Sequence, residues 1–186
     1  MEGGVTAWKG LMAEGAPQSG MAYFSPVTKL EELIALAWFL EDGSRKFYSE
    51  LGSTLIDKEA RDLYQQLAKA EEHHQGSLLK LYEELFGKAP DPRFPGSVIP
   101  PGKEGDVMEG GMLVGEALQW AKGKRTTDIL ELSISLETNA YDLYLKMERQ
   151  MKDQRSAQVF NVLSGEEKQH LERLSSLLEN IIWRRM

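Results

Sequence analysis

The sequence contains no cysteine and only three histidines among its 186 residues. Without cysteine the chain cannot form disulfides, hold zinc or iron through thiolates, or use a thiol nucleophile. No apolar run approaches the roughly 20 residues that span a membrane, and the first residues lack the basic and apolar regions of a signal peptide. We therefore expect a soluble cytoplasmic protein without a membrane partner, whose chemistry depends on carboxylates and histidines.

The sequence also lacks an excess of positive charge. Lysine and arginine number 22 against 29 acidic residues, which gives a formal net charge of −7. Because phosphate backbones are bound by clustered positive charge, we expect no nucleic-acid partner. Hydrophobic residues make up 41% of the chain and charged residues 27%, which is typical of a folded domain with a sizeable core.

Apolar residues recur with helical spacing in four long segments, at residues 30–51, 60–85, 130–151 and 159–181. Between the second and third segments, residues 87–112 hold five of the seven prolines and predict a linker, followed by a short helix near 113–122. The other joins are short, so each pair of helices forms an antiparallel hairpin. The sequence thus predicts an all-α, ferritin-like four-helix bundle of two antiparallel helical hairpins joined by a long crossover.

Helix ends are marked in the first hairpin. Thr28 and Glu31 have the spacing of a capping box at the start of the first helix. Asp57 is a suitable N-cap for the second helix, and Gly87 is a suitable stop.

The chain repeats itself without a gap at a spacing of 96 residues. The repeated pattern is a glutamate followed 30 residues later by Glu-x-x-His, and its members are Glu41, Glu71, His74, Glu137, Glu167 and His170. All six lie on the apolar stripes, where leucine would be expected. Because a lone buried carboxylate costs several kcal/mol, four of them in one core need compensating positive charge.

Two divalent metals would supply that charge, with two neutral imidazoles completing the coordination. Residues three apart on a helix are neighbours, so the Glu and His of each Glu-x-x-His can point at one spot. Oxygen-rich ligation suits iron or manganese better than a structural zinc site, and this donor set is the one known from di-iron carboxylate proteins. The alternative is a solvated charged face without metal.

Other polar residues near the pattern carry weaker signals. Tyr48 and Tyr144 follow Glu41 and Glu137 by two helical turns, so they either donate hydrogen bonds into the metal centre or are ordinary core residues. Further residues lie off the ligand stripe, where we expect them to be solvated: Glu72, His73 and Glu166.

From about residue 27 to 182 the chain resembles the rubrerythrin and ferritin-like di-iron superfamily. The motifs that carry the resemblance are Leu40-Glu41 with Tyr48, Leu67-Ala68-x-x-Glu71-x-x-His74, Leu136-Glu137 with Tyr144, and Leu163-Ser164-x-x-Glu167-x-x-His170. The resemblance implies two iron ions, with Glu41 and His74 on one, Glu137 and His170 on the other, and Glu71 and Glu167 bridging them. Manganese and zinc are alternative occupants.

The sequence departs from that pattern in two places. Ala140 stands where rubrerythrins have a second carboxylate one turn after the third-helix ligand, and a chain without cysteine has no rubredoxin domain. The N-terminal arm, residues 1–26, resembles the end of a rhodanese domain in Met1–Trp8 and Gly15–Pro17, or is an unrelated glycine-rich arm. If the rhodanese resemblance holds, residues 27–186 are the ferritin-like domain of a fusion protein.

Three functions remain open at this point. The first is a non-haem di-iron oxidoreductase that reduces hydrogen peroxide or dioxygen with electrons from an external donor, and we expect it to be a homodimer. The second is an iron-handling module that serves a sulfurtransferase partner. The third is a purely structural helical bundle, which metal analysis would distinguish from the other two.

Overall fold

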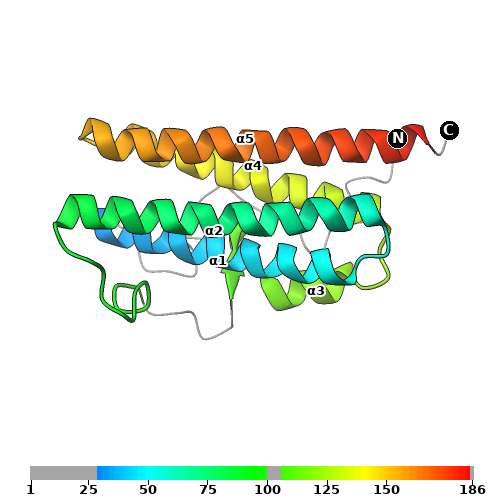
Figure 1. The fold of residues 1–186 in the computed structure, drawn as a ribbon, viewed down its shortest axis with the longest axis horizontal. Helices are drawn as coiled ribbons and strands as arrows, with labels where there is room; N and C mark the ends of the chain where they lie inside the picture. Colours follow the sequence, from blue (N-terminus) through cyan, green and yellow to red (C-terminus); the bar gives the residue numbers. More distant parts are fainter. Residues whose placement is uncertain (1–28, 100–105, 185–186) are drawn as a thin grey trace.

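The computed structural model describes residues 29–99 and 106–184, and within them four long helices form two antiparallel hairpins that lie side by side (Figure 1). The hairpin helices are α1 (Leu30–Thr54), α2 (Lys58–Phe86), α4 (Thr126–Gln150) and α5 (Gln154–Trp183). The crossover from α2 to α4 carries β1 (Val107–Met108), the 3₁₀ turn η2 (Glu109–Gly111), β2 (Met112–Leu113) and α3 (Val114–Ala121). The predicted all-α bundle of two hairpins with a long crossover is confirmed. The arm at residues 1–26, with its rhodanese-like segments, lies outside the described residues.

The ends of α2 match the sequence signals. Asp57 caps its start, because Asp57 Oδ1 accepts a hydrogen bond of 2.9 Å from the backbone N–H of Ala60. Gly87 ends it in the left-handed conformation, with a φ of 65°, which glycine adopts without steric cost. These two residues define the length of the helix that carries Glu71 and His74.

The start of α1 differs from the predicted capping box. The helix begins at Leu30, and the backbone N–H of Lys29 donates to Glu32 Oε2 at 3.3 Å. Because Lys29 is the N-cap, Glu32 and not Glu31 is the third helical residue, and Glu31 instead accepts a 2.5 Å hydrogen bond from the hydroxyl of Tyr82 on α2. The expected pairing of Thr28 with Glu31 is therefore wrong for Glu31, while Thr28 itself lies outside the described residues.

The crossover is more than the predicted linker, because it packs a small antiparallel ribbon against the bundle. Gly110 and Gly111 have φ values of 72° and 74° and reverse the chain between β1 and β2. A side-chain carbon added to Gly43 on α1 would lie 2.3 Å from the carbonyl oxygen of Val107, so only glycine permits this approach. The turn η2 contacts both α1 and α4. The crossover therefore covers the side of the bundle between these two helices.

Two apolar clusters fill the bundle on either side of a polar layer at mid-length. One cluster takes α1 residues 47–51, α2 residues 60–67, α4 residues 129–136 and α5 residues 174–181. The other takes α1 residues 33–40, α2 residues 78–82, α4 residues 140–147 and α5 residues 160–163. The interval left between them on every helix is where the predicted ligands lie. None of the helices in the described part of the chain could cross a membrane.

Candidate metal centre

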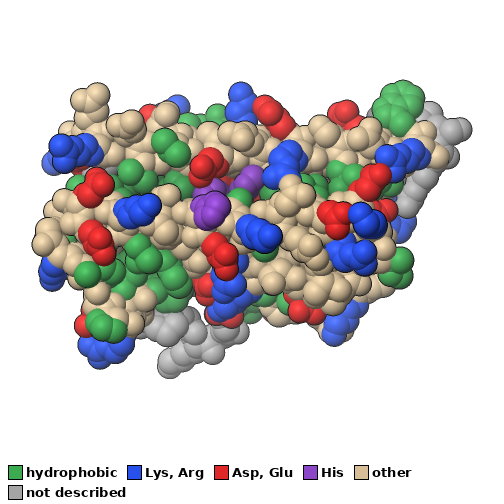
Figure 2. Space-filling view, in the orientation of Figure 1, with side chains coloured by type: hydrophobic (Ala, Val, Ile, Leu, Met, Phe, Trp, Pro, Cys, Tyr) green, Lys and Arg blue, Asp and Glu red, His purple; other side chains and the backbone are tan. Residues whose placement is uncertain are grey.

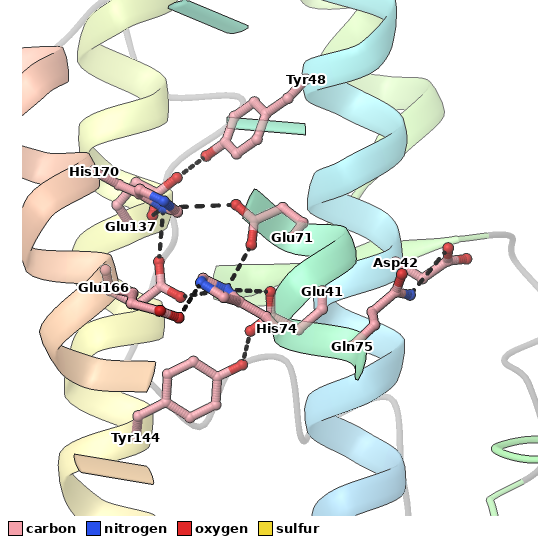
Figure 3. Close-up of polar contacts among 11 residues, drawn as sticks. Glu41, Asp42, Tyr48, Glu71, His74, Gln75, Glu137, Tyr144, Glu166 and His170 are labelled. Atoms are coloured by element: carbon pink, nitrogen blue, oxygen red, sulfur yellow. Dashed lines mark hydrogen bonds and ion pairs between the residues drawn. The ribbon is translucent and has the colours of Figure 1, made fainter. Parts of the chain in front are cut away.

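All four long helices contribute ionisable side chains to the polar layer (Figure 3). The contributors are Glu41 from α1, Glu71 and His74 from α2, Glu137 from α4, and Glu167 and His170 from α5. Each of the six is buried, and the most exposed, His170, shows only 4% of its surface. The structure thus brings together every residue that the repeat predicted as a metal ligand.

The six residues form two overlapping groups of donors. Within each group the ligand atoms lie within 4.8 Å of one another, and the groups are Glu41, Glu71, His74 and Glu167, and Glu71, Glu137, Glu167 and His170. Glu71 and Glu167 belong to both groups. This arrangement can hold two metals with two shared carboxylates.

The two shared carboxylates each present one oxygen to each histidine. Glu71 places Oε2 2.9 Å from Nδ1 of His74 and Oε1 3.7 Å from Nδ1 of His170. Glu167 places Oε1 3.1 Å from Nδ1 of His74 and Oε2 3.3 Å from Nδ1 of His170. A carboxylate that bridges two metals is oriented in this way.

The surroundings of His74 test whether a metal fits. Its Nδ1 lies 2.9 Å from Glu71, 3.0 Å from Glu41 and 3.1 Å from Glu167. A ring nitrogen has one proton or one lone pair, so it cannot form three hydrogen bonds at once. Around a first-row divalent metal with bonds of about 2.1 Å, neighbouring ligand atoms lie about 3 Å apart. The spacing of these donor atoms is therefore that of a metal's coordination shell.

Crowding of like charges in a buried layer shifts the pKa values of the cluster. Burial, together with the charge on Glu41, raises the pKa of Glu71 well above its usual range. Burial and the charge on Glu167 raise the pKa of Glu137 to about 7. Burial opposes a charge on His170, but Glu137 and Glu167 outweigh it and raise the pKa of this imidazole to about 11. The metal-free cluster thus holds protons at neutral pH, and a metal must displace them.

Each of the two tyrosines reaches across to the other hairpin. The hydroxyl of Tyr48 on α1 donates to Glu137 Oε1 on α4 at 2.6 Å, and the hydroxyl of Tyr144 on α4 donates to Glu41 Oε1 on α1. Burial is the main cause that raises the pKa of Tyr48, so its phenol remains a donor. Of the two interpretations open from the sequence, the contacts favour hydrogen bonding into the centre, because both tyrosines orient a candidate ligand.

Glu166 lies off the ligand stripe and is partly exposed, as predicted, but the sequence analysis missed its contact with His74. Its Oε2 lies 2.9 Å from Nε2 of His74, on the opposite edge of the ring from the donor cluster. The interaction with the His74 ring is the main cause that lowers the pKa of Glu166. The pair joins α5 to α2, so no signal along either helix could have found it. Glu72 and His73, which were also predicted to be solvated, are exposed.

The seam between α2 and α5 is where the centre comes near the surface. The Glu166 side chain is 43% exposed although the His74 ring that it contacts is buried. Figure 2 shows histidine and acidic side chains at the middle of this face, and the histidine that is exposed on α2 is His73, outside both donor groups. Glu166 therefore links the buried ring of His74 to the surface of the protein.

Replacing Glu166 with alanine is expected to weaken metal binding by about 10- to 100-fold, because a carboxylate on the far ring nitrogen orients a metal-binding histidine and increases its basicity. Anaerobic titration of the metal-free protein with Co²⁺, in competition with a chelator, measures the affinity. Glu72→Ala is the matched control, because Glu72 is exposed on α2. An unchanged affinity in Glu166→Ala would show that the Glu166–His74 contact has no part in metal binding.

The comparisons with known proteins agree with this geometry. The rubrerythrin family model matches residues 27–94 and 128–185, which is more than half of the chain, and the protein belongs to this family. The matched segments contain all six candidate ligands and both tyrosines, whereas the ribbon of the crossover lies between them.

The fold also matches a solved structure, of a hypothetical protein from Pyrococcus furiosus. The two share 25% sequence identity over 92% of this chain and 99% of that chain, with a TM-score of 0.63. A search of curated proteins gave no match. The structural relative thus supports the helical bundle, and the family match together with the donor geometry supports a buried cluster able to hold metal. Neither comparison names a reaction.

Proposed function

We propose that this protein is a non-haem di-iron oxidoreductase that reduces hydrogen peroxide or dioxygen. The observation that carries the proposal is the buried layer in which two donor groups share Glu71 and Glu167. Membership of the rubrerythrin family supports it. Iron is the metal we propose, because four carboxylates and two imidazoles form an oxygen-rich donor set that suits a redox-active first-row metal.

Each of the six candidate ligands would bind one or both metals. Glu71 and Glu167 would bind both metals. Glu41 and His74 would complete the ligands of one metal, and Glu137 and His170 those of the other. Two irons bound here would supply the two electrons that reduce one peroxide molecule. Reduction of peroxide to two waters also consumes two protons, and the half-exposed Glu166 on the α2–α5 seam is placed to pass protons inward from solvent.

Electrons must return to the centre from outside the chain. The sequence contains no cysteine, so it offers no thiolate-bound iron centre that could store electrons nearby. We therefore propose an external one-electron donor as the physiological partner. The buried tyrosines Tyr48 and Tyr144 would keep Glu137 and Glu41 in place while the charge of the centre changes.

Stopped-flow mixing tests the reaction. Protein loaded anaerobically with two Fe²⁺ per chain is mixed with one equivalent of hydrogen peroxide, and we expect rapid oxidation of both irons. Zn²⁺-loaded protein is the control and should consume no peroxide, because zinc has no redox chemistry. If the fully iron-loaded protein reacts with neither peroxide nor dioxygen, the proposed function is wrong even though the metal site is present.

A further inference from the structure

A seventh buried acid, Glu109, lies in the crossover and belongs to neither donor group. It begins the turn η2, and only 5% of its surface is exposed. Its Oε2 atom has no hydrogen-bond partner among the described residues. Because buried polar atoms are nearly always paired, an unpaired carboxylate oxygen next to a polar centre calls for an explanation.

The fold places Glu109 on the side of the candidate metal centre that faces α1 and α4. Val107 contacts α1 at Gly43, two residues after Glu41, and Glu109 follows two residues after Val107. Because η2 contacts both α1 and α4, Glu109 lies between these helices, across the bundle from the α2–α5 seam. Ser44, next to Gly43, also has a buried hydroxyl without a partner among the described residues. Two unpaired polar groups thus lie within two residues of this contact.

The pKa of Glu109 is consistent with a position near the buried carboxylates of the layer. Burial is the first cause of its strongly raised pKa, and the charges of Glu41, Glu71 and Glu167 are the next. These three carboxylates are the ones that share a donor group with His74. Glu109 therefore lies close enough to this group for its charge to be felt there.

The helix positions one turn after two of the candidate ligands carry small side chains. Ser44 and Ala140 each lie one turn after a candidate ligand, Glu41 and Glu137, and both are small and 2% exposed.

We propose that Glu109 is a further carboxylate ligand of the centre, supplied by the crossover to the divalent metal bound by Glu41, Glu71, His74 and Glu167. The metal would give the unpaired oxygen its partner and offset the charge of the surrounding carboxylates. This inference rests on the metal site of the proposed function and not on its reaction with peroxide.

Titration of the full chain with Co²⁺, whose visible absorption reports its coordination, tests the assignment. We expect Glu109→Gln, which keeps the size and removes the charge, to weaken one of two bound Co²⁺ by about 10-fold or more and to alter its spectrum. The other Co²⁺ should bind as in the wild type. Glu109→Asp, which keeps the charge on a shorter side chain, should bind with intermediate affinity and remains informative if Glu109→Gln does not fold. The control is Glu116→Gln, at an exposed position on α3.

Two results would overturn the assignment. One is a Glu109→Gln protein that binds both Co²⁺ ions with the affinity and spectrum of the wild type. The other is an equal weakening of both ions, which indicates a general structural effect. Neither measurement involves peroxide, so an inert iron-loaded wild type would overturn the proposed reaction while leaving this inference standing.

Discussion

Replacing Glu71 or Glu167 with alanine is expected to leave a protein that cannot hold two metals at once. Each of these carboxylates presents one oxygen to His74 and the other to His170. Each is also shared by both donor groups, so its loss removes a ligand from both metals. We expect metal content to fall from about two per chain to one or fewer, with two-electron oxidation by peroxide lost as a consequence.

Elemental analysis after gel filtration measures the metal content of these variants. Glu71→Gln adds a test in which the size of the side chain is kept, and it should also fail to hold two metals because an amide is a poor bridge. Glu72→Ala changes the adjacent, exposed residue of α2 and should retain both metals. Two metals per chain in Glu71→Ala or Glu167→Ala would contradict the bridging assignment.

The helical part of the centre could be predicted from the sequence because its positions follow a helical period. A Glu-x-x-His on an apolar stripe must direct both side chains to one face. The 96-residue repeat then indicates that two such helices face each other around a shared layer. These regularities come from backbone geometry, so they can be read without tertiary contacts.

The features that the sequence did not predict depend on contacts between helices or between a helix and the crossover. Glu109 lies in a stretch rich in proline and glycine, and its position is set by the approach of Val107 to Gly43, which no period encodes. Glu166 is on the outer part of α5 and becomes relevant only because α2 packs beside it. The capping prediction for α1 was wrong by one residue, since Lys29 is the N-cap and Glu32 accepts the hydrogen bond expected of Glu31.

The two histidines of the repeat differ in the residue that contacts their outer ring nitrogen. Glu166 contacts Nε2 of His74, but the position that corresponds to Glu166 in the first half of the chain, 96 residues earlier, is Ala70. His170 therefore has no equivalent carboxylate from the repeat. Because such a partner increases the basicity of a metal-binding imidazole, we expect His74 to be the more basic ligand of the two if the cluster holds metal.

Loading with metal is expected to raise the melting temperature by more than about 10 °C. A ligand that binds only the folded state at 1,000 times its Kd stabilises by about 4 kcal/mol per site. For a chain of this size each kcal/mol corresponds to about 2–4 °C. Two sites in a layer where buried like charges raise the pKa values of Glu71 and Glu137 should therefore give a large shift. Thermal unfolding followed by circular dichroism, with metal and with chelator, measures it.

The pH dependence of this shift separates a buried centre from metal bound at the surface. A pKa of about 7 means that folded Glu137 holds its proton more tightly than the unfolded chain, so rising pH between about 4.5 and 7 destabilises the metal-free fold. Metal binding must displace that proton and the one on His170, whose pKa is about 11. Both effects make the metal-induced increase in melting temperature larger at pH 8 than at pH 6. Metal-free and loaded proteins that melt at the same temperature at pH 8 would show that the six residues do not form a buried metal centre.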